Sequence, residues 1–383
     1  MRDNDVCFLP LGGGQRVGAS CYYLRLGKHN IILDAGIGFD KNTLFEPDFR
    51  PLLTSPFLKS LSQIDQIFIS HAHLDHIGYL PKLMSLARHA QVYMTETTAM
   101  LTQYQMLDSR LSQNDGAEEN ERLATQYLLQ QVAKVGYLQS ICFGDCTATF
   151  YQAGHIPGAM MIMFSFDGRN ILYTGDYSVD STDLTGGCDL LDDSQIDTVI
   201  MCGLHAKRPN YRRTADAVYS RADKILLHAN LGENIVCHTA QISKGVEFLK
   251  ILNGRNNHHI PIYVDSQLMQ IVEVMEKLSI PILNIDNHLL NDIHDLKPHI
   301  LLTSKHQKRS LDGYRHIQVD FTLHEDFAEM TQLLKHYNPR QAVLVHCAEP
   351  LREDDMTIEQ VLMRDGDSQT QFLFAEEKEI YKL

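Results

Sequence analysis

The sequence predicts an α/β protein large enough for two domains, or for one large domain that carries an insertion. Three observations lead to this prediction. The chain has 383 residues. Short apolar runs with strand spacing alternate with stretches of helical spacing. Clusters of histidine and aspartate directly follow several of the apolar runs, as functional side chains do at the strand ends of α/β proteins.

The first half of the chain shows the alternation most clearly. Strands are predicted at residues 6–10, 21–26, 30–36, 64–69, 91–94, 147–153, 160–166 and 170–174. Helical spacing covers residues 79–88 and a long region from 95 to about 135, interrupted by S-Q-N-D-G at 112–116. The glycine-rich stretch at 11–20 is predicted to be a tight loop between strands, because no helix follows it to complete a phosphate site.

Composition narrows the functional classes. Apolar residues make up 44% and charged residues 21% of the chain, which describes an ordinary soluble globular protein. No leader or membrane-spanning run is apparent, so we expect a cytoplasmic location and no membrane partner. The 8 cysteines are scattered, without the spacing of a disulfide framework, and are expected to be reduced thiols.

Charge is unevenly distributed along the chain. The net charge of −14 argues against a protein coated with nucleic acid. Residues 203–318 nevertheless contain 15 Lys and Arg against 11 Asp and Glu, a surplus of four positive charges, which leaves −18 for the rest. A basic module on an acidic body is typical of a protein that handles a polyanion.

The stretch S-H-A-H-L-D-H-I-G at residues 70–78 organises the chemistry. It places His71, His73, Asp75 and His76 directly after a predicted buried strand. Imidazole and carboxylate ligands suit zinc, and His71 and His73 alternate on an extended backbone so that they point the same way. Asp75 and His76 lie beyond the turn, so the spacing indicates two metal positions.

Two further strand ends contribute a histidine and an aspartate. His155 lies in A-G-H-I-P-G, and Asp176 follows a strand and a glycine in Y-T-G-D-Y-S. Each alone is usually structural in a turn. With the cluster at 70–78 they supply a third ligand for the first metal and a carboxylate that can bridge both. Asp34, at the end of an earlier strand, is expected to orient a ligating histidine.

These motifs together resemble the metallo-β-lactamase fold. P-L-G-G-G-Q-R-V-G-A-S-C at 10–21, L-D-A-G at 33–36 and A-G-H-I-P-G-A at 153–159 resemble, more narrowly, its β-CASP branch of RNA-processing nucleases. That branch includes the pre-mRNA 3′-end cleavage endonuclease and bacterial and archaeal RNases. The resemblance implies an αββα sandwich with an inserted, shortened β-CASP-like α/β cap. The expected parts are residues 1–202, a cap at 203–318, and 319–383.

The family's two closing histidine motifs have candidates in this chain. His346 ends a predicted strand in Q-A-V-L-V-H and resembles the histidine that completes the second metal site. His324 resembles the histidine near the scissile phosphate, although it also precedes a helical segment and could simply cap it. Cys202 stands where the family has the acid that orients this histidine. Glu325 and Asp326 are candidates to replace that acid.

The resemblance implies a dinuclear zinc phosphodiester hydrolase, most of all a ribonuclease that cleaves single-stranded RNA through a metal-bridging hydroxide. His71, His73 and His155 would hold one ion; Asp75, His76 and His346 the other; and Asp176 would bridge. Mn²⁺ or Fe suits the same ligands. Asp75 and His324 are the predicted catalytic residues, with His324 donating a proton to the leaving oxygen because an ordinary imidazole is partly protonated at neutral pH.

Substrate contacts and two alternatives stay open at this stage. Lys207, Arg208, Arg212 and Arg213 could bind phosphate or simply form a solvated basic segment. The same metal core also suits a hydrolase of a small thioester, lactone or cyclic nucleotide, since fold does not fix function. A poorly active RNA-binding subunit is the third alternative. Self-association into a homo-oligomer is left open.

Overall fold

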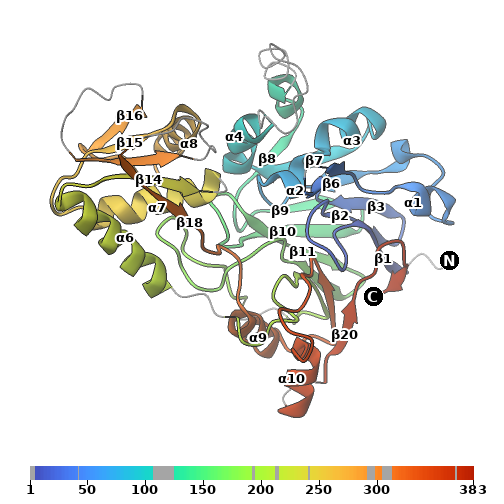
Figure 1. The fold of residues 1–383 in the computed structure, drawn as a ribbon. Helices are drawn as coiled ribbons and strands as arrows, with labels where there is room; N and C mark the ends of the chain where they lie inside the picture. Colours follow the sequence, from blue (N-terminus) through green and yellow to red (C-terminus); the bar gives the residue numbers. More distant parts are fainter. Residues whose placement is uncertain are drawn as a thin grey trace. The chain divides into compact units, whose positions relative to one another are not determined.

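The computed structural model describes residues 5–41, 43–106, 125–191, 195–211, 215–239, 242–290, 298–303, 313–366 and 369–383. The chain divides into two compact units (Figure 1). Unit 1 consists of Met1–Asp180, Gly186–Arg212 and His324–Leu383, and unit 2 of Ser181–Thr185 and Arg213–Leu323. The larger segment of unit 2 is thus inserted between two parts of unit 1.

Unit 1 contains two sheets of seven strands. The first has the order β21-β1-β2-β3-β6-β7-β8. Its strands are β1 (Val6–Gly12), β2 (Cys21–Leu26), β3 (His29–Leu33), β6 (Gln66–Phe68), β7 (Gln91–Thr95), β8 (Ala133–Val135) and β21 (Tyr381–Lys382). The strands from β3 to β8 are parallel, so their carboxyl ends lie along one edge.

The second sheet has the order β20-β19-β13-β12-β11-β10-β9. Its strands are β9 (Ser140–Phe143), β10 (Cys146–Gln152), β11 (Met160–Phe166), β12 (Arg169–Tyr173), β13 (Thr198–Cys202), β19 (Gln341–Val345) and β20 (Gln371–Phe374). Strands β12, β13, β19 and β20 are parallel. This sheet therefore also presents a row of carboxyl ends.

Alternating side chains make the two sheets pack face to face. In β1, Phe8 belongs to the core between the sheets, which also contains Phe150 and Phe164 of the second sheet. Leu9, its neighbour, faces the other way into a core with Leu80 and Leu83. Because successive strand residues point to opposite faces, a strand that is apolar throughout must be covered on both sides.

Helices supply these outer layers. The helices of the amino-terminal part are α1 (Arg50–Thr54), η1 (Leu61–Gln63), α2 (Leu74–Ile77), α3 (Leu80–Leu86) and α4 (Glu96–Gln105), beside a small hairpin of β4 (Gly38–Asp40) and β5 (Thr43–Phe45). Those of the carboxyl-terminal part are α9 (Phe327–Tyr337) and α10 (Ile358–Arg364). Val199 and Leu344 on the outer face of the second sheet are fully buried, so that face is covered as well. The αββα sandwich predicted from the sequence is confirmed.

Unit 2 is an α/β layer with five parallel strands in the order β16-β15-β17-β14-β18. The strands are β14 (Asn234–Thr239), β15 (Ile262–Val264), β16 (Asn287–Leu289), β17 (Ile300–Thr303) and β18 (Tyr314–Val319). The helices are α6 (Ala215–Asn230), α7 (Ile242–Arg255) and α8 (Ser266–Lys277). The Asp265 side chain accepts a hydrogen bond from the Leu268 backbone N–H and so begins α8.

The main difference from the sequence prediction concerns the long helical region at 95–135. Helix α4 ends at Gln105, and β8 takes up residues that the prediction gave to a helix. Ala133–Val135 pairs in parallel with β7, and a β-branched residue at its buried end favours that pairing over local helix propensity. The predicted break at 112–116 lies outside the described residues.

None of the helices among the described residues is long and apolar enough to cross a membrane.

Helix α9 provides a stability prediction. The Asp326 carboxylate accepts hydrogen bonds from the backbone N–H groups of Ala328 and Glu329, at 2.7 and 3.0 Å. Asp326→Ala leaves these donors unsatisfied and should lower the free energy of unfolding by about 1 kcal/mol. Asp326→Asn keeps an accepting oxygen and should cost much less. Urea denaturation followed by circular dichroism measures both; an equal loss in the two variants would contradict a capping role.

Candidate metal centre

Histidine and aspartate side chains converge where strands of unit 1 end. Residues 70–76 follow β6, Asp176 follows β12, and His346 follows β19. His155 lies in the loop between β10 and β11, where Gly154 and Gly158 both have positive φ. A Cβ at Gly154 would lie 2.4 Å from the Gly187 backbone carbon, so only glycine permits this close approach.

One group contains three imidazoles and a carboxylate. Nδ1 of His73 lies 3.1 Å from Nε2 of His71 and 3.1 Å from Nε2 of His155. Asp176 Oδ2 is 3.7 Å from His71 Nε2 and 4.0 Å from His155 Nε2. These four residues are all buried. The structure thus brings together the residues predicted for the first metal.

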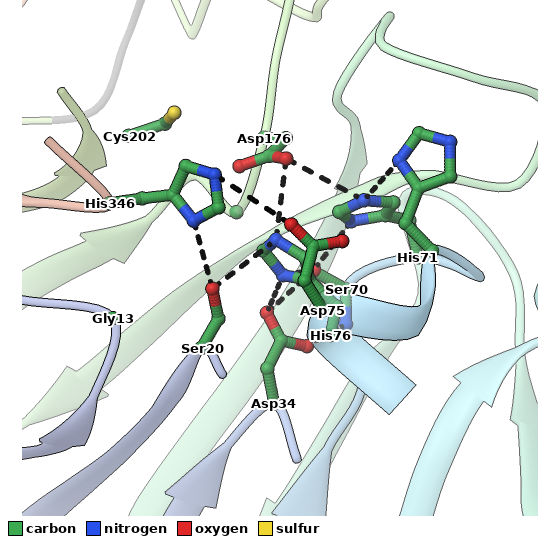
Figure 2. A network of polar contacts seen from close by, with 12 residues as sticks. Gly13, Ser20, Asp34, Ser70, His71, Asp75, His76, Asp176, Cys202 and His346 are labelled. Carbon is green, nitrogen blue, oxygen red and sulfur yellow. Dashed lines mark hydrogen bonds and ion pairs between the residues drawn. The ribbon is translucent and has the colours of Figure 1, made fainter. Parts of the chain in front are cut away.

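A second group lies beside it and shares the same carboxylate. Nε2 of His346 is 3.8 Å from Asp75 Oδ2, and Nε2 of His76 is 3.3 Å from Asp176 Oδ2. Figure 2 shows Asp176 between His71 and His346, with Asp75 and His76 in the same cluster. The ligand atoms of Asp75, His76 and His346 lie within 4.8 Å of one another.

The donor set fits metal ions. Both carboxylate oxygens of Asp176 are buried, and neither accepts a hydrogen bond within the described part of the chain. A buried carboxylate that accepts no hydrogen bonds is energetically unfavourable unless a cation compensates its charge. Although burial opposes ionisation, His76, His346 and His324 lower the pKa of Asp176 well below its ordinary value. Ring nitrogens about 3 Å apart are spaced as neighbouring ligands of one zinc ion, each about 2.0–2.1 Å from it.

The side chain of Asp34 holds His76 in position. Its Oδ2 accepts a 2.7 Å hydrogen bond from His76 Nδ1, so the other ring nitrogen is left to face Asp176. The Ser70 backbone N–H and the Tyr173 hydroxyl also donate to the Asp34 carboxylate, at 2.6 and 2.5 Å. Asp34 therefore stands where the sequence prediction put it, next to a histidine of the cluster.

The sequence analysis did not predict two contacts that hold the side chains of this cluster in position. Tyr173 contacts Asp34 from a strand 139 residues away, and Ser20 Oγ lies 3.0 Å from His346 Nδ1. Ser20 is in the glycine-rich loop, which the sequence analysis treated only as a turn. That loop contacts the site directly, because the His346 backbone N–H donates to the Gly13 carbonyl at 2.6 Å. No local pattern marks either residue, since both contacts depend on how the strands pair.

Backbone strain is concentrated at the same place. Ala19, Asp34 and His346 have φ values of 53°, 59° and 55°, in the left-handed region. Left-handed backbone is unfavourable for residues other than glycine, most of all for a residue such as alanine that has no polar side chain to compensate. Strain of this kind persists when the surrounding structure determines it and is frequent at functional sites.

His324 lies at the edge of the cluster, but its charge differs from the prediction. Its Nδ1 is 3.6 Å from Asp176 Oδ2, and its ring centroid is 4.4 Å from that of His155. Burial lowers the pKa of His324 well below its ordinary value, against the opposing effect of Asp176. The expectation of a protonated imidazole at neutral pH rested on an exposed histidine. A pKa lowered in this way favours the neutral ring, which offers one N–H.

The two acids after His324 have different positions. Asp326 caps α9, so its carboxylate already accepts backbone hydrogen bonds. The helix therefore does not need His324 as a cap. Glu325 is fully buried, and neither of its carboxyl oxygens has a hydrogen-bond partner within the described ranges. Burial, with smaller contributions from Asp176 and Glu329, raises the pKa of Glu325 well above its ordinary value. The Cys202 side chain lies close to this carboxyl group and opposes the rise in its pKa.

The predicted phosphate-binding residues are only partly described. Lys207 Nζ lies 5.7 Å from the centre of the Phe374 ring, and Arg208 Nε donates to the Glu349 carbonyl at 2.8 Å. Both cations are thus engaged within unit 1. Arg212 and Arg213 lie outside the described residues.

Comparisons with known proteins identify the superfamily of this chain. Residues 14–214 match the metallo-beta-lactamase superfamily. The chain is 28% identical over 267 residues to "RNase aCSPSF2" of Saccharolobus solfataricus, covering 69% of this chain and 52% of that protein. It is 27% identical to "Ribonuclease TTHA0252" of Thermus thermophilus, covering 68% and 58%. It therefore spans little more than half the length of these relatives.

Two more comparisons extend this result. "Endoribonuclease YSH1" of Mycosarcoma maydis is 34% identical over 188 residues, 46% of this chain and 20% of that protein. A crystal structure of a protein of unknown function from Enterococcus faecalis covers 99% of this chain and 100% of that chain, with TM-score 0.62 and 11% identity, and so shares the fold. The chain belongs to the metallo-beta-lactamase superfamily and, within it, to the β-CASP branch that its sequence motifs resemble.

Proposed function

We propose that this chain is a dinuclear metal-dependent phosphodiester hydrolase that cleaves single-stranded RNA. The observation that carries the proposal is the convergence of imidazoles on one buried carboxylate. Asp176 Oδ2 lies within 4.0 Å of ring nitrogens from His71, His76 and His155. A carboxylate with two faces toward two sets of ligands is the arrangement that a pair of bridged cations requires.

Each ion would have its own ligands. One ion would be held by His71, His73, His155 and Asp176, and the other by Asp75, His76, His346 and Asp176. Neutral imidazole and carboxylate favour zinc, and manganese or iron are the competitors that the same ligands admit. Asp34 and Ser20 then act through the ring nitrogens that face away from the ions, where they fix the tautomers of His76 and His346.

The chemistry follows from the charges. Two divalent cations, when bound, acidify a water molecule toward neutral pH and neutralise the phosphate oxygens that gain charge during cleavage. Asp75, in the same cluster, can position that water. His324 is the residue we assign to the leaving oxygen: its neutral ring gives an N–H hydrogen bond there, which stabilises the developing negative charge without requiring a protonated imidazole.

RNA is the preferred substrate on two grounds. The relatives named above are called ribonucleases. Residues 203–318 also carry the surplus of positive charge on an otherwise acidic chain. We propose that unit 2 is the cap that recognises the polyanion, and that Lys207, Arg208, Arg212 and Arg213, where the chain passes from unit 1 into unit 2, contact phosphate groups.

One observation favours a second candidate, hydrolysis of a small ester such as a thioester or cyclic nucleotide. Arg208 is tied to the Glu349 carbonyl and Lys207 lies over Phe374, which leaves these cations less available to a nucleic-acid backbone. Assays of single-stranded RNA and of small esters on one zinc-loaded sample distinguish the two. Cleavage of neither, with metal bound, would instead support a binding subunit.

Metal content tests the ligand assignment. Asp176→Ala removes the shared ligand and should reduce bound zinc by more than His346→Ala, which removes a ligand of one ion only. Chelation should abolish RNA cleavage in the unaltered protein and added zinc should restore it. His89→Ala alters an exposed histidine and serves as the matched control. Elemental analysis of the purified variants is the measurement; normal zinc content in Asp176→Ala would refute the assignment.

Asp34→Ala tests the support of His76. Loss of the carboxylate that accepts from His76 Nδ1 should weaken metal affinity about 10- to 100-fold. Tyr173→Phe removes one of the donors to Asp34 and should have a smaller effect in the same direction. Competition with a chromophoric chelator measures both affinities. An unchanged affinity in Asp34→Ala would show that this contact does not orient the ligand.

His324→Ala tests the leaving-group contact. It should slow RNA cleavage about 10²-fold or more at saturating substrate, because a group acting only in the transition state lowers kcat with little effect on KM. A substrate with an activated leaving group should recover most of the lost rate. Equal losses on both substrates would argue against a contact with the leaving oxygen.

A further inference from the structure

Cys202 occupies a position that neither of the two proposed ion sites uses. It is the last residue of β13, whose neighbours β12 and β19 lead to Asp176 and His346. The side chain is 1% exposed. Its backbone N–H donates to Thr174 Oγ1 at 3.1 Å, which ties the end of β13 to the turn that carries Asp176. A thiol thus lies on the same edge as the predicted ligands.

Three different donor atoms meet at this thiol. The sulfur of Cys202, an oxygen of Asp176 and a ring nitrogen of His324 all lie within 4.8 Å of one another. Figure 2 shows the sulfur pointing toward Asp176. The distance from Asp176 Oδ2 to His324 Nδ1 is 3.6 Å, close to the separation of two ligands on one tetrahedral ion.

The carboxylate has donor capacity left for this position. Oδ2 of Asp176 is the oxygen near the imidazoles of His71, His76 and His155. Oδ1 is also buried and accepts no N–H or O–H hydrogen bond within the described ranges; the group close to the carboxylate there is the Cys202 thiol. Bridging two ions requires the carboxylate but does not exhaust its four lone pairs. An unsatisfied buried oxygen next to a buried thiol is what a further cation would explain.

We propose that Asp176, Cys202 and His324 form an additional cation position, which shares Asp176 with the dinuclear centre and selects a thiophilic divalent ion of the zinc or cadmium class. Thiolate, imidazole and carboxylate together are ligands that such ions take in preference to magnesium or calcium. Sulfur is absent from the two ligand sets of the dinuclear centre, so a sulfur signal distinguishes this position from those two.

The proposal deepens the function given above and, in what it says of catalysis, rests on it. A cation on Nδ1 of His324 fixes the imidazole proton on Nε2. The ring then keeps the N–H that we assign to the leaving oxygen, in a single orientation. The family that the sequence resembles has an acid at position 202, which orients the histidine. In this chain a cation held by the Cys202 thiol would orient His324 instead.

Cobalt(II) titration of the metal-free protein tests the position, because cobalt bound to thiolate absorbs in the near ultraviolet by charge transfer from sulfur, whereas nitrogen and oxygen ligands give no such band. The protein should develop the band and bind one equivalent more than Cys202→Ser, which should lack it. Cys202→Asp should bind the additional equivalent without the band. Cys237→Ser, at a buried strand cysteine of unit 2, is the matched control and should keep both.

The outcomes separate the two proposals. Absence of the band in the unaltered protein, or its survival in Cys202→Ser, would overturn the cation position. His324→Ala should weaken the band, and an unchanged spectrum would remove His324 from the ligand set and with it the proposed position. RNA cleavage by the same cobalt-loaded samples is measured in parallel. A band without cleavage would refute the proposed function alone, and cleavage without a band would refute the cation position alone.

Discussion

The site depends on one buried negative charge, the carboxylate of Asp176. Residue Asp176 is 1% exposed, and four imidazoles from three separate segments of unit 1 lie within 4.0 Å of its Oδ2. In a medium of low polarity such a charge is strongly unfavourable by itself. The neighbouring histidines cannot all be protonated together without repelling one another, and burial lowers the pKa of His71 and of His324, which favours their neutral forms. Metal cations satisfy the carboxylate and the imidazole lone pairs at once.

The rest of unit 1 fixes the directions of these side chains. In the second sheet β12 and β19 are both parallel to β13, so their carboxyl ends lie on one edge, and in the first sheet β6 is parallel to β3. The turns that follow β6, β12 and β19 carry the histidines and aspartates of the candidate metal centre. This arrangement requires unfavourable left-handed backbone at Ala19, Asp34 and His346. The Gly13 and Gly14 carbonyls accept the backbone N–H groups of His346 and Cys347, so the glycine-rich loop holds the last histidine in place. The glycine-rich loop therefore contacts a histidine of the candidate metal centre.

Sequence patterns predicted most of unit 1 and most of the residues that the site contains. Strand-end histidines and aspartates are recognisable because hydrophobic runs stop at polar side chains, and this pattern located His155, Asp176 and His346. What the sequence could not provide are contacts made across strands, such as Ser20 with His346 and Tyr173 with Asp34. Nor could it predict the neutral ring of His324 or the strand at Ala133–Val135, since both result from burial and pairing rather than local preference.

Anomalous diffraction at the zinc absorption edge, from crystals of the protein grown with zinc, tests the central claim most directly. The account requires two strong peaks on either side of Asp176, one within coordination distance of His71, His73 and His155 and the other of Asp75, His76 and His346. Peaks that avoid Asp176, or a site without zinc in which Asp176 is satisfied by protein groups alone, would contradict it.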